Sequence, residues 1–154
     1  MMPPAPTLSP EAKYRLLLKL SQEIGRSLDL QEVLAYLLES LRSAVAYDAA
    51  GIFVLNRSVR LGQEAGGRLI AGMAVVGFDE TPRDEDPMLR RGEGIIGHVI
   101  ATGQTVIAPD VRRDAHYVEG RAGTRSEIAV PIASAGEVIG ALNLESDMLD
   151  AFSE

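Results

Sequence analysis

The sequence predicts a single α+β domain built on an antiparallel sheet. Two stretches with helical apolar spacing come first, and the rest of the chain consists mainly of short apolar runs that end in a hairpin pattern. The chain has 154 residues, which is enough for one domain with its own core. We expect residues 1–10 to be a disordered, Pro-rich lead-in and residues 11–154 to form the domain, with a last helix that is truncated.

The first two elements are expected to be helices. Ser9-Pro10-Glu11 has the residue types of a helix start, and apolar residues with helical spacing follow as far as Leu28. Asp29, with Glu32 three residues later, has the pattern of a capping box and opens the second helix. The apolar face of that helix is expected to contain Val33, Leu34, Leu37, Leu38, Leu41 and Val45. Helices with such faces can pack on a sheet or pair with a second copy of the chain.

The period of the apolar residues then changes to that of strands. Residues 49–55 form a short apolar run with polar neighbours, and residues 68–78 resume this pattern after a polar, Gly-containing stretch. The acidic, Pro-containing segment 79–86 is predicted to be irregular. Residues 94–101 are typical of a short helix that ends at Gly103.

The pattern in the last third of the chain predicts three strands and one long loop. A brief strand over residues 105–108 stops at Pro109, and residues 110–125 have no clear period. Long loops of this kind in compact domains are often functional. Residues 127–133 and 137–144 predict two strands joined as a hairpin, and residues 150–154 have the pattern of a helix that is just beginning.

Composition and charge exclude several classes of function. The chain has no cysteine, which removes disulfides, Cys-ligated zinc, iron–sulfur clusters, cysteine nucleophiles and thioether-linked cofactors. Its 15 basic and 22 acidic residues give a formal net charge of −7, which disfavours nucleic acid and anionic membrane surfaces as partners. There is no membrane-spanning run and no signal-peptide pattern, so we expect a cytoplasmic protein without membrane insertion.

No pattern of catalytic or metal-binding residues stands out. Residues 92–97 match GxGxxG, but the polar segment before them lacks the buried strand that a dinucleotide site needs, which favours a tight turn into a helix. His98 and His116, the two histidines, have no further ligand at metal spacing. The acidic segment 79–86 lacks the Gly and terminal Glu of a calcium loop, and no serine lies in a nucleophile elbow. We therefore predict no catalytic residue and no metal.

The order of segments in the second half of the chain is more specific. The segments RGEGIIGHVIATGQTVIAPDV, DAHYVEG, RSEIAVPI and GEVIGALNLES follow one another as in the signature of the GAF domain, which the chain resembles over residues 11–154. The helices in LLLKLSQEIGRSLDLQEVLAYLLESL and the strand DAAGIFVLN also resemble that family. The resemblance implies a PAS-related fold with a central antiparallel sheet of about six strands. N-terminal helices would cover one face, and a helix and a loop would cover a pocket on the other.

The resemblance also implies which residues line that small-molecule pocket. From the helix, strands and loop these are Phe78, Ile95, Ile96, His98, Val99, Asp110, His116, Tyr117, Ser126 and Glu127. A simpler interpretation stays open for each of them. The apolar residues are also what a helix needs to sit on a sheet, and Asp110, which follows Pro109, can form an Asx turn instead.

The function implied by the resemblance is that of a non-catalytic sensory or regulatory domain. It would bind an unidentified small molecule and relay a signal to an attached output domain of a bacterial-type signalling protein. Free methionine sulfoxide reductases share the fold but use cysteines, and bilin-binding relatives also need one. Cyclic-nucleotide-binding relatives carry Asn-Lys, whereas Leu144 follows Asn143 here.

Two alternatives remain open. One is a ligand-free module that forms a homodimer through its terminal helices. The other is a haem-based gas or redox sensor that uses His98 or His116.

Overall fold

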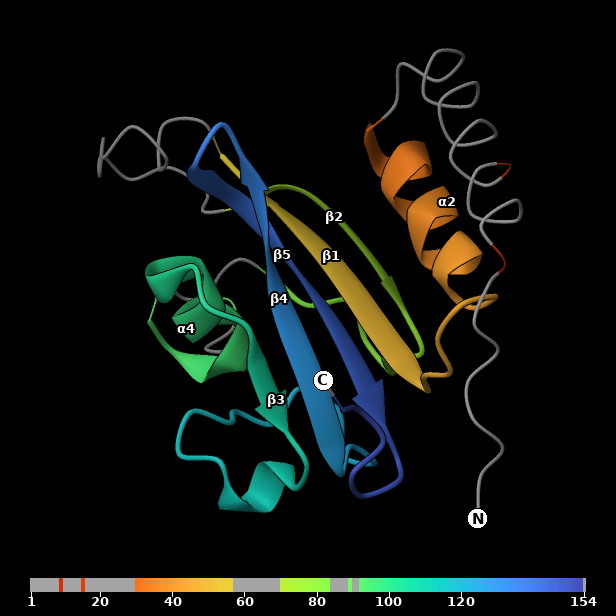
Figure 1. Ribbon diagram of the computed structural model, residues 1–154, viewed down its shortest axis with the longest axis vertical. Coiled ribbons are helices and arrows are strands. Elements are labelled where there is room, and N and C mark those ends of the chain that lie inside the picture. The colour runs from red at the N-terminus through yellow and green to blue at the C-terminus, as the bar shows by residue number, and fades with distance from the viewer. Residues whose placement is uncertain are drawn as a thin grey trace.

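The computed structural model describes residues Ser9, Arg15, 30–56, 70–83, Leu89 and 92–153. In this part of the chain a five-stranded antiparallel sheet has the order β2-β1-β5-β4-β3 (Figure 1). The strands are β1 (Ala49–Leu55), β2 (Ile70–Val76), β3 (Val106–Ala108), β4 (Ser126–Ser134) and β5 (Glu137–Ser146). The predicted α+β class is confirmed, with five strands among the described residues where about six were expected.

In the described part of the chain, one α-helix covers each face of the sheet. Helix α2 (Leu30–Leu41) packs on one face, and helix α4 (Gly94–Thr102) lies on the opposite face, beside the loop that follows β3 (Figure 1). Because successive strand residues point to opposite faces, Ile52 packs in the core under α2 and Phe53 packs in the core under α4. The sheet therefore separates two apolar cores, as expected for helices on both of its faces.

Both helices follow their sequence patterns. In α2, Leu34 and Leu38 are buried, and Val33, Leu37 and Leu41 are half-buried. Val45, the last residue of the predicted face, is half-buried but lies beyond the end of the helix. Helix α4 ends at Gly103, which has a φ of 67° and donates its N–H to the carbonyl of Val99. The first predicted helix lies outside the described residues except for Ser9 and Arg15.

The terminal hairpin joins the two longest strands. The expected strands over 127–133 and 137–144 are confirmed as β4 and β5, with a turn in which Ala135 and Gly136 have φ values of 51° and 81°. Two positive φ values in a two-residue turn match the right-handed twist of the strands that it joins. This hairpin brings the start of β4 and the end of β5 into register.

The segment after β5 differs from its prediction. A helix was expected to begin in residues 150–154, but Asp150 has a positive φ of 53° and residues 151–153 are not helical. Phe152 is buried in the core under α2 instead, which fixes this segment against the sheet. The burial of Phe152 explains why the local helical pattern does not decide the conformation here.

Asp48 connects the start of β1 to the end of β5. Its Oδ2 accepts hydrogen bonds from the Ser146 hydroxyl at 3.1 Å and from the Asp147 N–H at 2.8 Å. We expect Asp48→Ala to lower the free energy of unfolding by about 1 kcal/mol, because both bonds lie at a solvent-accessible edge. Urea unfolding measures this change, with Asp79→Ala as an exposed control. An unchanged Asp48→Ala variant would contradict the assignment.

Candidate functional site in the buried carboxylates beneath the 109–125 loop

Two glutamates are buried side by side on the sheet face that α4 and the loop cover. Glu127 on β4 and Glu145 on β5 are paired in register, and their residues are 3% and 2% exposed. Side chains that lie directly opposite each other on neighbouring strands are close, and like charges at such positions repel. Asn143, two residues before Glu145 and therefore on the same face, is fully buried.

Few hydrogen-bond donors reach this cluster of Glu127, Asn143 and Glu145. Asn143 Nδ2 donates to Glu127 Oε1 at 3.3 Å and to Glu145 Oε1 at 2.9 Å. The Thr124 hydroxyl donates to Glu145 Oε2. Asn143 Oδ1 is buried and receives no hydrogen bond from the described residues. Buried polar atoms normally have partners, so an unpaired acceptor beside two carboxylates needs an explanation.

Burial makes both carboxyl groups harder to ionise. Burial, followed by the negative charges of Glu145 and Asp114, raises the pKa of Glu127 to about 8, and the hydrogen bond from Asn143 acts in the other direction. Burial also raises the pKa of Glu145, against the effects of Thr124, Arg121 and Asn143. In the described part of the chain neither glutamate forms an ion pair. Among these residues no ion pair therefore compensates the charge of the two ionised carboxylates.

The 109–125 loop covers the cluster. Thr124 is buried beside Glu145, and Tyr117 is half-buried close to both glutamates. Burial and these negative charges raise the pKa of Tyr117 to about 12, so that its hydroxyl stays neutral. Arg121, on the same loop, forms an ion pair with Asp147, which follows β5, with 2.6 Å between Arg121 Nη1 and Asp147 Oδ1.

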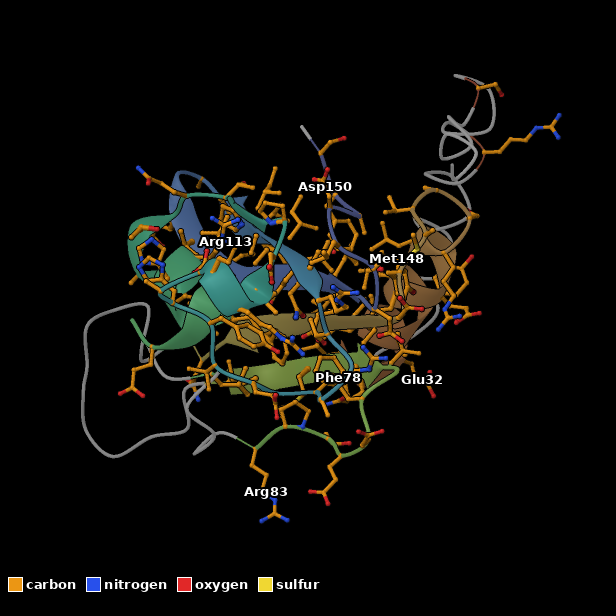
Figure 2. The ribbon with its side chains drawn as sticks, turned by 90° about the horizontal axis from the view of Figure 1, so that it is seen from below. Glu32, Phe78, Arg83, Arg113, Met148 and Asp150 are labelled. Carbon is orange, nitrogen blue, oxygen red and sulfur yellow. The ribbon has the colours of Figure 1, made fainter. Side chains whose placement is uncertain are left out.

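The apolar residues predicted for the pocket pack in the core under α4. Ile95, Ile96 and Val99 are buried there with Phe53, and Phe78 is half-buried against the same core. Phe78 follows the end of β2, whereas Arg113 lies in the loop that follows β3 (Figure 2). These four apolar side chains thus do the packing that a helix needs on a sheet.

The predicted polar residues fall into separate groups. Asp110 accepts a hydrogen bond from the Arg112 N–H at 3.1 Å and caps the 3₁₀ helix η2 (Val111–Arg113). The hydroxyl of Ser126 donates to the Met148 carbonyl, at 2.6 Å, on the opposite face of β4 from Glu127. Glu127 and Tyr117 are therefore the two predicted residues that the structure brings to the buried cluster.

The two histidines come together although 18 positions separate them in the sequence. The ring centroids of His98 and His116 are 4.0 Å apart, and His116 Nδ1 lies 3.4 Å from Asp114 Oδ1. The rings are tilted by 35° to each other, and at this separation they leave no space for an iron atom between them. Among the residues that the structure describes, no group of three or more His, Asp or Glu side chains is arranged to hold a metal ion.

Sequence reasoning missed three members of the site: Thr124, Asn143 and Glu145. A signal for two of them was present, because Asn143 and Glu145 are polar residues at alternate positions of an otherwise apolar strand. Their pairing with Glu127 depends on the register between β4 and β5, which the sequence pattern leaves open.

A separate hollow lies at the other edge of the sheet. It has a volume of about 1210 Å³ between the start of α2, strand β2 and residues 80–83. The side chain of Arg83 there projects away from the sheet (Figure 2). The hollow is open, and none of the described residues that line it is a buried polar residue, so we regard the carboxylate cluster as the better candidate site. In the described part of the chain no helix is long and apolar enough to cross a membrane.

Comparison with known proteins agrees with this fold. Over 66 residues the chain is 33% identical to GAF domain-containing protein A of Dictyostelium discoideum, which covers 43% of this chain and 42% of that protein. Over 135 residues it is 26% identical to the Nif-specific regulatory protein of Azospirillum lipoferum, which covers 82% of this chain and 20% of the regulator. The chain thus spans less than half the length of either relative.

A solved structure and a family model complete the comparison. The free methionine-R-sulfoxide reductase of Neisseria meningitidis, in complex with its substrate, aligns with 99% of this chain and 85% of its own at a TM-score of 0.63 and 21% identity. This likeness shows a shared fold. The family model for the GAF domain matches residues 29–154, and on this match the chain belongs to the GAF domain family.

Proposed function

We propose that this chain is a non-catalytic sensory domain that binds a small molecule at the cluster of Glu127, Asn143 and Glu145. The observation that carries the proposal is the buried carboxylate pair, to which the described residues supply few donors. Burying charged groups in this way destabilises a fold, and such arrangements are concentrated at functional sites. A ligand that completes the hydrogen bonding of Glu127 and Glu145 explains why the sequence has two glutamates at these buried positions.

The loop above the cluster offers a route for the signal. Arg121 pairs with Asp147, the Arg125 N–H donates to the Ser146 carbonyl, and the Asp150 N–H donates to the Pro109 carbonyl. Met148 and Asp150 lie in the segment that these bonds hold (Figure 2). A ligand that moves the loop therefore also moves residues 146–151, from which an attached output domain would receive the change. Such coupling requires that the ligand bind one loop arrangement better than another.

Ligand entry itself requires loop movement, because the glutamates are covered. Glu127 and Glu145 lie beneath Thr124 and Tyr117, and the Arg121–Asp147 ion pair holds the loop down. Asp147 is half-exposed in this pair, so solvent weakens the interaction. The ion pair is thus a weak part of what holds the loop, which suits a site that exchanges its ligand.

Two comparisons support this function. The fold of the neisserial reductase holds a small molecule, its substrate, and the Azospirillum relative is a regulatory protein. Reduction of a sulfoxide by protein thiols needs cysteine, and this chain has none. We therefore assign ligand binding without turnover. Dimerisation through the terminal helices stays a prediction, since the first of these helices lies outside the described residues.

Native mass spectrometry of the purified chain, before and after incubation with a small-molecule extract, tests the proposal. We expect a species with added mass that disappears on denaturation. The Thr124→Val variant, which loses the bond to Glu145, should retain much less of this species. Thr105→Val, at an exposed position, is the matched control. Wild-type chain that stays bare in every extract, or equal retention by Thr124→Val, would contradict the proposed site.

A further inference from the structure

With both carboxyl groups ionised, the buried cluster is short of hydrogen-bond donors and not of acceptors. Glu127 and Glu145 carry two acceptor oxygens each, and the described donors to them are the Asn143 amide and the Thr124 hydroxyl. Asn143 Oδ1, which faces Gly51 on β1, is a further buried acceptor without a donor from the described residues. All the unmet groups are thus of one kind. When both carboxyl groups are ionised, the charge of the cluster is negative as well.

From this imbalance we infer that the ligand of the proposed site carries a protonated amine or guanidinium group that binds between Glu127 and Glu145. The inference rests on the proposed function and names the chemical class of its ligand. N–H donors of a cation form charge-assisted hydrogen bonds with carboxylates, and these are about twice as strong as neutral ones. Such a group supplies both the donors and the positive charge that the cluster lacks.

The geometry favours a nitrogen cation over a metal ion. Asn143 Nδ2 lies between the two carboxylates, at 3.3 Å and 2.9 Å, so the cluster already accommodates an N–H donor at that place. In addition, no group of acidic or histidine side chains in the described part of the chain is arranged for a metal.

A proton competes with this ligand. Around neutral pH burial keeps Glu127 protonated, because its pKa is raised to about 8, whereas a cation binds the ionised form. The cation therefore displaces a proton, and its binding should strengthen as the pH rises. The other titratable or charged groups about the cluster come from the strands, the loop and helix α4. They are Glu145 on β5, Asp147 after it, Asp48 before β1, Asp114, Tyr117, Glu119 and Arg121 on the loop, and His98 on α4, which reaches Asp114 through His116.

Backbone amide NMR titration of the isotope-labelled chain tests the inference with defined probes. Ethanolamine and agmatine serve as cations, ethylene glycol as a neutral probe, glycolate as an anion and CaCl2 as a metal source, all at equal ionic strength. We expect the two amines to change the chemical shifts of the backbone amides of residues 124–127 and 143–146. Their affinity should rise about 10- to 100-fold between pH 6 and pH 8.5, with release of a proton. The glycol, glycolate and calcium should leave these amides unchanged.

Two substitutions make the test specific to the carboxylates. Glu127→Gln and Glu145→Gln should each remove the amine response, whereas Glu137→Gln, on the exposed first residue of β5, should retain it. Absence of an amine response, an equal response to ethylene glycol, or a response that survives both substitutions would overturn the inference. An acidic or neutral molecule retained in native mass spectrometry would overturn it too, yet leave the proposed function standing. Wild-type chain that binds neither the amines nor any molecule from the extract would overturn both the inference and the proposed function.

Discussion

Glu127→Gln is expected to make the protein more stable above pH 8, by an amount on the order of a few kcal/mol. The folded-state pKa of Glu127 is about 8, against an ordinary value of 4.5, because the carboxyl group is buried next to Glu145. The stability that comes from protonated Glu127 is fully present below about pH 4.5 and is lost as the pH rises to about 8. Glutamine keeps the shape, has no charge to bury and so avoids this loss.

Urea unfolding at pH 5, 6.5 and 8.5 measures this effect. The free energy of unfolding of the wild-type chain should fall across this range, and that of Glu127→Gln should fall less. Glu137→Gln, at the exposed start of β5, should follow the wild-type curve. Parallel curves for Glu127→Gln and wild type would mean that Glu127 ionises normally inside the fold. A stabilising substitution that also abolishes amine binding is the pattern of a site maintained at the expense of stability.

Phe53→Ala is expected to lower the free energy of unfolding by about 3–5 kcal/mol. Phe53 is fully buried in the middle of β1, in the core under α4. Its ring also lies over Gly51, where an added Cβ would come within 2.6 Å of Phe53 Cε2 and 2.8 Å of Asn143 Oδ1. Loss of the ring therefore leaves a cavity that adjoins the buried amide oxygen of the site.

Chemical denaturation followed by circular dichroism measures this change. Phe78→Ala, which truncates a half-buried ring at the margin of the same core, should have a clearly smaller effect. Phe53→Leu, which keeps most of the apolar volume, should recover much of the loss. If Phe53→Ala and Phe78→Ala were equally mild, the core under α4 would not depend on the central ring as we infer.

Much of the fold was predictable from local patterns. The run at residues 49–55, the hairpin over 127–144 and the helix that ends at Gly103 each correspond to an observed element, because apolar period and turn residues act within a few positions of the chain. The end of the chain was not predictable in this way. Residues 151–153 are not helical because Phe152 is held in a core built by distant residues.

The site was predictable only in part. The resemblance to the GAF family gave Glu127 and Tyr117, which lie at the cluster, but also Ser126, whose hydroxyl bonds the Met148 carbonyl on the opposite face of β4. Neighbouring residues of a strand point to opposite faces of the sheet. Which of the two faces Ser126 is on therefore became known only when the register of β4 was known. Asp110 likewise fits the Asx-turn interpretation, since it caps its own local helix.

The sequence by itself determined the class of fold, the order of its elements and the chemistry that the chain lacks. These properties depend on period, turn residues and composition, which are local or additive. The tertiary structure alone decided that Glu127 faces Glu145, that Asn143 donates to both, and that Arg121 closes the loop on Asp147. Those contacts join residues that lie up to 26 positions apart, and strand register and loop packing bring them together only when the whole sheet has formed.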